Sequence, residues 1–213
     1  MLAAALVLTW ALGAAGAVWE LQKHADGIRV WTRPSATSSF DEYRGEMVLD
    51  QPVTVPASLA FAPKTWRHWI GRVKGAWTLA QVAPGETLTN TLVAGTWPVA
   101  DRDSPTRNII SQDPETLAIV IRTVAEPDAA PKTKGAVRVR QLAGTWTFQP
   151  LGPQRTRVLW EVASQPGGDI PAVLANAVVV SQPFDTLKGL RKACRKLGPQ
   201  DSLPEGFRDQ AQP

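Results

Sequence analysis

The order of the predicted elements constrains the fold most, because a run of strand-like segments is followed by one long apolar helical segment. The strand-like segments are rich in Val, Ile, Thr and aromatic residues, and Gly, Pro, Asn or Asp bounds each of them. They span residues 76–83, 86–95, 106–113, 116–124, 137–151 and 156–165. Short turns between successive strands favour an antiparallel sheet, and the 18 prolines and 16 glycines fit a chain with many turns.

The segment before this run predicts a hairpin and two short helices. Residues 28–33 alternate apolar and polar side chains, which indicates a strand, and residues 40–49 continue as a second strand. We expect residues 18–27 to form a short helical or irregular lead that ends in a turn. Within residues 53–70, apolar side chains recur near helical spacing, which predicts two short helical pieces. Residues 126–135 predict a long surface loop.

The C-terminal segment predicts one helix from about Ile170 to Lys196, bent where Pro183 lacks a backbone donor. Asp169 can cap its start, and Gly198 ends it. Residues 198–213 have little to bury and are expected to be a disordered tail. The apolar side of the helix must be buried, and the concave side of the sheet is the surface large enough to cover it. We therefore expect an α+β fold with a curved antiparallel sheet wrapped around the helix. A pocket remains between them wherever side chains do not fill the space.

Residues 1–17 carry no charged side chain and end in Ala15-Gly16-Ala17, a small-x-small cleavage pattern that predicts a signal peptide. The segment is shorter than the ~20 residues that a spanning helix needs. We therefore expect an exported protein, periplasmic or secreted, with a domain over residues 18–197. An uncleaved anchor is the alternative, and it would tether the domain to a membrane. Cys194 is the single cysteine, so an intrachain disulfide is excluded.

Charge and motif content argue against several function classes. The net charge of +4 is spread thinly, which argues against nucleic acid as a partner. His24 and His68 are far apart and lack nearby ligands at metal-binding spacing, so we expect no metal and no other cofactor. The sequence has no Gly-x-Ser-x-Gly elbow and no phosphate-binding glycine loop. No catalytic constellation is recognised, and we expect a monomeric protein that is not an enzyme.

Two charged segments each have a structural and a functional interpretation. In the segment PVADRD, Arg102 can tie strands together through a carboxylate such as Asp101 or Asp103 and nearby carbonyls, or it can point into the cavity toward a ligand. We favour the structural role. The basic end of the last helix can offset the helix dipole or attract an anionic membrane surface. Its residues are Lys188, Arg191, Lys192, Arg195 and Lys196.

Several segments in this order resemble the START family, the steroidogenic-acute-regulatory-protein-related lipid-transfer domains of the helix-grip superfamily. They are WELQKHADGIRVWTR, the Trp66 and Trp69 pair, TWPVADRD, VRVRQLAGTWTFQPL, TRVLWEVASQPGGDIPAVLAN and QPFDTLKGLRK, and they cover about Trp19 to Lys196. After Asp103 the chain has Ser104-Pro105, where the family usually has an aromatic or aliphatic residue and then Val. The resemblance implies a helix-grip fold with one deep cavity for a lipid or similar molecule and the last helix as its lid.

We expect the ligand contacts to come from large side chains on the elements that face this cavity, although most of the tryptophans can equally be core residues. The candidates are Trp66, Trp69, Trp77, Trp97, Arg102, Ile121, Trp146, Phe148, Trp160, Val178 and Phe184. The leading hypothesis is a binder or carrier of a lipid or other hydrophobic small molecule. An enzyme of the cyclase, aromatase or hydrolase type and a protein-interaction module with a filled interior are the alternatives.

Overall fold

A computed structural model describes residues 17–95, 99–168, 176 and 179–211. The strands are β1 (Glu20–Ala25), β2 (Ile28–Arg33), β3 (Glu42–Leu49), β4 (Val73–Ala83), β5 (Glu86–Val93), β6 (Asp101–Gln112), β7 (Ile119–Ala125), β8 (Ala136–Arg138), β9 (Gln141–Gly152) and β10 (Arg155–Gln165). The helices are α1 (Thr54–Ala60), α2 (Pro63–Trp66) and α4 (Ser181–Leu197). No helix among these described residues is both long and apolar enough to cross a membrane.

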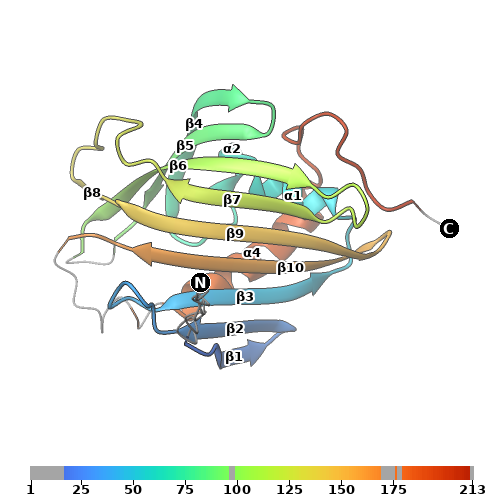
Figure 1. Ribbon diagram of the computed structural model, residues 1–213, viewed down its shortest axis with the longest axis horizontal. Coiled ribbons are helices and arrows are strands. Elements are labelled where there is room, and N and C mark those ends of the chain that lie inside the picture. Colours follow the sequence, from blue (N-terminus) through green and yellow to red (C-terminus); the bar gives the residue numbers. More distant parts are fainter. Residues whose placement is uncertain (1–16, 96–98, 169–175, 177–178, 212–213) are drawn as a thin grey trace, which may run out of the picture.

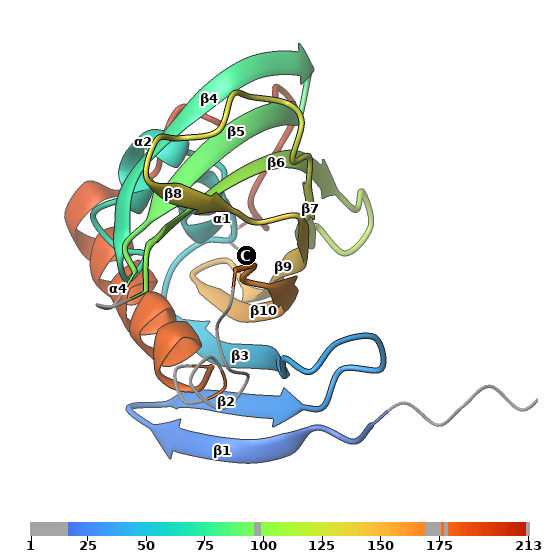
Figure 2. The ribbon, with the colours of Figure 1, turned by 90° about the vertical axis from the view of Figure 1, so that its left-hand side faces the viewer.

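The strands form one sheet in the order β1-β2-β3-β10-β9-β7-β6-β5-β4, and every neighbouring pair in this order is antiparallel. The short strand β8 pairs in parallel with the start of β6. Figure 1 views the outer face of the sheet, with α4 behind it. Figure 2 shows from the side that the sheet curls around α4 and that α1 and α2 lie on the same concave side. The predicted α+β fold is confirmed.

The prediction for the first segment was wrong, because residues 20–25 form the edge strand β1. β1 pairs with β2, and Asp26 and Gly27 connect the two strands with φ angles of 52° and 68°. Two successive residues with positive φ are what a two-residue type I′ hairpin turn requires. The side chains of β1 are mostly exposed, so its sequence lacks the alternation that reveals a half-buried strand.

Helix α4 begins at Ser181, later than predicted. Before it, Asn176 is helical and Val179 and Val180 form a turn, while residues 169–175, 177 and 178 lie outside the described part of the chain. Pro183 is in the first turn of α4. In a first turn the missing N–H of proline costs no intrahelical hydrogen bond. The helix ends before Gly198, as predicted, and Gly198 has a φ of 63°.

The apolar side of α4 packs on the concave face of the sheet. Leu187 and Leu190 are fully buried there. A Cβ atom placed on Gly45 of β3 would lie 2.7 Å from Cδ1 of Leu187, so the absence of a side chain at residue 45 lets the helix approach the sheet. The core continues through the buried face of α1, which includes Leu59.

The C-terminal tail was predicted to be disordered, but residues 198–211 make defined contacts. Leu203 and Phe207 pack against the core and anchor the tail through apolar contacts. Asp209 accepts hydrogen bonds from the backbone N–H and the hydroxyl of Thr54 at 2.9 and 2.8 Å. The carboxylate therefore caps the first turn of α1, where backbone N–H groups have no intrahelical partner.

Candidate functional site: the concave face of the sheet

Aromatic side chains gather on the concave face where β3, β9 and β10 lie. Trp160 of β10 and Trp146 of β9 are directly paired, and their rings stack with centroids 4.5 Å apart. Phe148 also stacks on Trp146 at 5.8 Å, while Trp69 and Tyr43 meet the cluster edge-on at 6.1 Å and 5.2 Å. All five are at most 8% exposed. They form a flat and rigid apolar wall of the kind that lines ligand pockets.

The segment around α2 orients two of the predicted tryptophans. The indole N–H of Trp69 donates to Oγ1 of Thr65 at 3.0 Å, and that of Trp66 donates to the carbonyl oxygen of Ala60 at 3.1 Å. Thr65 is itself held by a hydrogen bond to the carbonyl oxygen of Ala62 at 2.8 Å. Trp69 is buried in the aromatic cluster, whereas Trp66 is half-buried beside the core.

Uncharged polar side chains occupy the other half of the concave face, on β5, β6 and β7. Nδ2 of Asn108 donates to Oγ1 of Thr89 at 2.9 Å, and its Oδ1 accepts from Oγ1 of Thr123 at 2.9 Å. The hydroxyl oxygens of Thr89 and Thr106 lie 3.0 Å apart. Thr89, Thr106 and Asn108 are at most 5% exposed. We call Thr89, Thr106, Asn108 and Thr123 the polar network.

The sequence does not reveal the polar network by itself, because threonine is also an ordinary strand residue. The available signal was the spacing of Thr87, Thr89 and Thr91, since alternate residues of a strand face the same side of a sheet. The hydrogen-bonded pairs of the network are 15 to 19 residues apart in the sequence, so only the sheet register brings the partners together.

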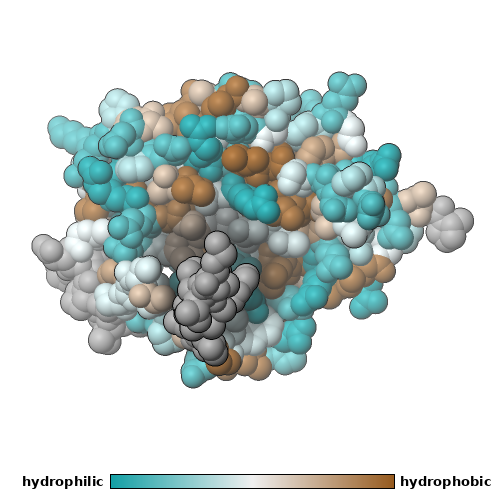
Figure 3. All heavy atoms as spheres, viewed as in Figure 1, coloured by the Kyte–Doolittle hydropathy of each residue, from teal (hydrophilic) through white to brown (hydrophobic). Residues whose placement is uncertain are grey.

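The concave face is almost free of charge. Across β3, β10, β9, β7, β6 and β5, register and strand alternation place the described Asp, Glu and Lys side chains on the outer face. Arg102 is the one charged side chain of these six strands on the concave side. Figure 3 shows that the outer face is mixed, with hydrophobic patches among hydrophilic ones. Ile109 and Val124 are exposed apolar residues of this face.

Arg102 bonds carbonyl oxygens and not the carboxylates that the sequence suggested. Its guanidinium donates to Pro166 and Gly167 at 3.2 Å and 3.0 Å, and also to Ala100. Asp101 instead pairs with Lys74 at 2.6 Å. Arg102 therefore ties the start of β6 to the segment that follows β10. Adjacent strand residues point to opposite faces, which is why neither neighbouring aspartate reaches Arg102.

Asp103 forms a buried ion pair with Arg138 of β8. Nε and Nη2 of Arg138 donate to the two carboxylate oxygens at 2.9 Å and 2.8 Å, and the Asp103 side chain is fully buried. The N–H of Thr133 donates to the same carboxylate at 2.8 Å. Arg138 also donates to carbonyl oxygens of Pro127, Ala130 and Pro131. The hydrogen bonds from Arg138 lower the pKa of Asp103 to about 2.

The remaining predicted site residues are scattered. Ile121 pairs directly with Trp146 and is buried, so it joins the aromatic wall. Phe184 is buried on α4, where Nζ of Lys23 lies 3.6 Å from its ring centroid. Trp77 was placed wrongly: it is 43% exposed on the edge strand β4, and it pairs with Asn90, whose side chain lies on the face opposite Thr89. Trp97 and Val178 lie outside the described residues.

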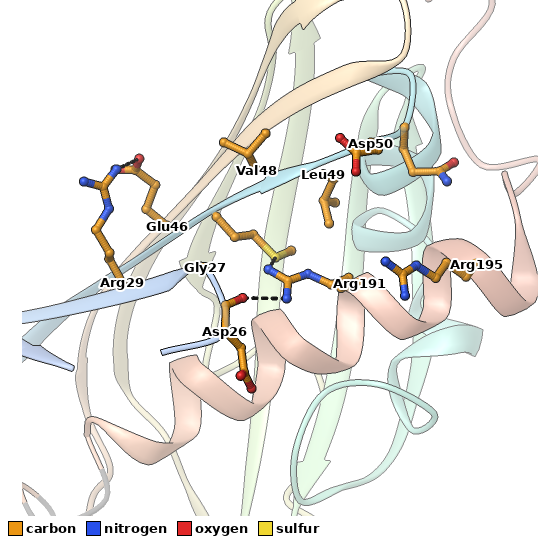
Figure 4. Close-up of a pocket in the computed structure, with 11 residues that line it drawn as sticks. Asp26, Gly27, Arg29, Glu46, Val48, Leu49, Asp50, Arg191 and Arg195 are labelled. Atoms are coloured by element: carbon orange, nitrogen blue, oxygen red, sulfur yellow. Dashed lines mark hydrogen bonds and ion pairs between the residues drawn. The ribbon is translucent and has the colours of Figure 1, made fainter. Parts of the chain in front are cut away.

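A hollow of about 310 Å³ lies at the surface between α4, the β1–β2 turn and β3, as Figure 4 shows. Arg191 and Arg195 project into it from α4, and Arg191 donates to the carbonyl oxygen of Asp26 at 2.7 Å. The carboxylate of Asp26 pairs with Lys188 at 2.9 Å, and this hydrogen bond lowers the pKa of Asp26. The charged lining makes this hollow unlike the concave face, and it offers little to an apolar ligand.

Two further hollows, of about 260 and 300 Å³, lie away from α4 and share the side chains of Val124, Ala143 and Ala163. Of the three hollows, only the first touches α4, and none is lined by the aromatic side chains of the concave face that α4 covers. The cavity expected there from the sequence stays a prediction.

A curved antiparallel sheet that encloses a C-terminal helix, with an aromatic and almost uncharged concave face, defines a helix-grip protein. Comparisons with known proteins give the family. The START domain model matches residues 2–200. An uncharacterized protein of Pseudomonas aeruginosa is 33% identical over 178 residues, which cover 84% of this chain and 87% of that protein. Human phosphatidylcholine transfer protein is 25% identical over 186 residues, which cover 85% of this chain and 86% of that protein.

Solved structures agree with this assignment. The crystal structure of a STAR-related lipid transfer protein from Xanthomonas axonopodis is 33% identical, with a TM-score of 0.77 over 83% of this chain and 98% of that one. Human STARD10 shares the fold, with a TM-score of 0.75 at 18% identity over 84% of this chain and 73% of that one. The chain belongs to the START family, as its motifs predicted.

Proposed function

We propose that this protein binds a lipid or another hydrophobic small molecule between the concave face of the sheet and α4, and that it carries this ligand without transforming it. The observation that carries the proposal is the composition of the concave face, where an aromatic wall and an uncharged polar network meet. Membership of a lipid-transfer family and the relation to phosphatidylcholine transfer proteins support the same ligand class.

The test is the lipid content of the native protein, measured by mass spectrometry after purification without organic solvent or detergent. Bound lipid is expected at up to one molecule per chain. A vesicle assay with a total bacterial lipid extract then measures uptake by the emptied protein. Unchanged protein without bound lipid in either experiment contradicts the proposal and favours an interaction module. Chemical conversion of the bound molecule would favour an enzyme.

A variant that fills the ligand space sharpens this test. Gly144 of β9 pairs with Thr123 on the concave face, and a Cβ atom there meets its nearest neighbours at an ordinary 3.6 Å. Gly144→Leu is therefore expected to fold and to take up less lipid. Thr145→Leu is the matched control, since Thr145 is the next residue of the same strand and faces outward. Equal lipid uptake by both variants contradicts binding at this face.

The basic residues of α4 are proposed to contact anionic membrane surfaces during loading. Lys188 and Arg191 have partners at the β1–β2 turn, whereas Lys192 and Lys196 are exposed, with no ion pair to another described residue. Each basic residue near such a surface adds about 1 kcal/mol of attraction, which salt screens. The double variant Lys192→Gln, Lys196→Gln is expected to sediment less with anionic vesicles. Lys132→Gln, Lys134→Gln in the 126–135 loop is the control.

We also propose that the protein is exported and loses residues 1–17 on export. The support is the uncharged apolar segment and its Ala15-Gly16-Ala17 end. Intact-mass measurement of the exported protein tests this proposal. A mass that includes Met1 contradicts cleavage and favours a membrane-tethered domain.

A further inference from the structure

A buried hydroxyl without a partner lies beside the polar network. Ser104 of β6 is 6% exposed, and its Oγ has no hydrogen-bond partner among the described residues. Ser104, Thr106 and Asn108 alternate along β6, so their side chains share the concave face. A buried hydroxyl that is left unpaired costs free energy, and native proteins rarely keep one without a reason. A polar group of a bound molecule would satisfy Ser104.

A second such hydroxyl, Oγ1 of Thr186, lies on the buried side of α4 and is fully buried. Ser104 and Thr186 therefore present unused hydrogen-bonding capacity from the sheet and from the helix that covers it. The amide oxygen of Asn90 also lacks a partner in the described chain, but strand register places Asn90 with Trp77 on the other side of the sheet.

The same region offers almost nothing to a charged group. The buried side chains of α1 and α4 are all uncharged. Arg102 is committed to the carbonyl oxygens of Ala100, Pro166 and Gly167. Lys23, at the edge of the sheet, lies over the ring of Phe184. A phosphate or a quaternary amine buried here would lack an opposite charge, and an unpaired buried charge is strongly unfavourable.

We infer that the ligand of this protein is an apolar molecule whose polar part is uncharged, such as a hydroxyl or an amide, and that Ser104 and the polar network receive this part. The inference rests on the proposed lipid binding and names the class of lipid. It separates this chain from its relatives that are named for phosphatidylcholine, because the apolar part can be shared while the head group differs.

The experiment compares two lipids with identical acyl chains. Dioleoylglycerol has a free hydroxyl, and dioleoylphosphatidylcholine adds a phosphate and a quaternary amine to that position. The emptied full-length protein is incubated with vesicles that contain both lipids in equal amounts, and native mass spectrometry gives the ratio of the two bound forms. Dioleoylglycerol is expected to exceed dioleoylphosphatidylcholine at least tenfold.

Two serine variants on the same strand test the assigned contact. Ser104→Ala should bind dioleoylglycerol about fivefold more weakly than the parent, which is the net effect of one hydrogen bond. The ligand-free variant should melt at or above the temperature of the parent, because it loses an unpaired buried hydroxyl. Ser111→Ala is the control, since Ser111 is on the outer face of β6 and exposed.

Each contrary result has a separate meaning. Equal or preferred binding of dioleoylphosphatidylcholine overturns the inference and leaves the proposed lipid binding in place. Equal affinity of Ser104→Ala and Ser111→Ala for dioleoylglycerol overturns the role of Ser104. Failure to bind either lipid, or any component of the total bacterial lipid extract, overturns the proposed function and the inference with it.

Discussion

Gly189 of α4 packs directly against the backbone carbonyl oxygen of Trp69, and a Cβ atom at residue 189 would overlap that oxygen. This contact explains a glycine in the middle of a helix, where it costs up to about 1 kcal/mol relative to alanine. It also couples the helix that covers the concave face to the tryptophan that borders the aromatic wall. The position of α4 over the candidate site therefore depends on a residue without a side chain.

Gly189→Ala is expected to lower the free energy of unfolding by about 1 to 3 kcal/mol, the usual cost of adding a methyl group to a packed site. The helix propensity of alanine acts in the opposite direction and is smaller. Urea unfolding measures the change. Gly71→Ala is the control, because a Cβ atom there meets nothing within 4 Å. A Gly189→Ala variant as stable as the parent would contradict the close packing of α4 on Trp69.

Asp103→Asn is expected to destabilise the protein by about 3 to 5 kcal/mol, because it leaves the guanidinium of Arg138 without its buried counter-charge. The comparison is Asp128→Asn in the 126–135 loop, whose carbonyl oxygens contact Arg138. Asp128 and Arg140 lie 4.0 Å apart and are 90% and 70% exposed, so that pair contributes at most about 1 kcal/mol. Chemical denaturation of both variants gives the two values, and similar values would mean that the Asp103–Arg138 pair is not buried in solution.

Asp103 also makes stability depend on pH in the acid range. Its pKa is about 2 in the folded protein and about 3.9 in an unfolded chain, so the unfolded chain takes up the proton first as the pH falls. The carboxylate therefore stabilises the fold by about 2 kcal/mol above pH 4, and this contribution is lost between about pH 4 and pH 2. The difference in unfolding free energy between the parent and Asp103→Asn should shrink by about 2 kcal/mol across that range. A constant difference between them would contradict the lowered pKa.

Local sequence patterns were sufficient to predict the elements that have one buried and one exposed face. The alternation in residues 28–33 and the glycine that ends α4 each report a local geometry, and the structure has the predicted strand and helix end. The edge strand β1 has no such signal, because most of its side chains are exposed. The position of the tail depends on contacts far along the chain, such as Asp209 with Thr54.

The candidate site likewise contains residues that could be placed from the sequence and residues that could not. Large aromatic residues on β9 and β10 could be assigned to the interior from the sequence, because strand alternation and burial preference agree there. Trp77 could not, since an edge strand with three register shifts does not reveal which side chains face inward. The partner of Asp103 was missed because Arg138 is 35 residues away and belongs to a short strand that runs parallel to β6.

The buried thiol of Cys194 on α4 should be protected from reagents in the folded protein. Burial raises its pKa to about 12, so the reactive thiolate is scarce at pH 8. A thiol reagent such as 5,5′-dithiobis(2-nitrobenzoate) is expected to react at least a hundredfold faster in denaturant than in buffer. Because α4 covers the candidate site, faster labelling of the emptied protein than of the lipid-loaded one would indicate that α4 moves away from the sheet when the ligand is absent. Rapid labelling of the folded, loaded protein would contradict the burial of Cys194.

Arg102 joins the start of β6 to the carbonyl oxygens of Pro166 and Gly167. Arg102→Ala should lower the free energy of unfolding by about 2 kcal/mol, because these carbonyls lose a charged donor. Arg102→Lys should restore little of this, since one ammonium group cannot reproduce the planar fork that spans three acceptors. Both variants should keep the parent's preference between dioleoylglycerol and dioleoylphosphatidylcholine. Thermal melting reports the structural role of Arg102, and native mass spectrometry reports a role in ligand binding. A variant that melts like the parent but no longer retains lipid would place Arg102 in the binding site.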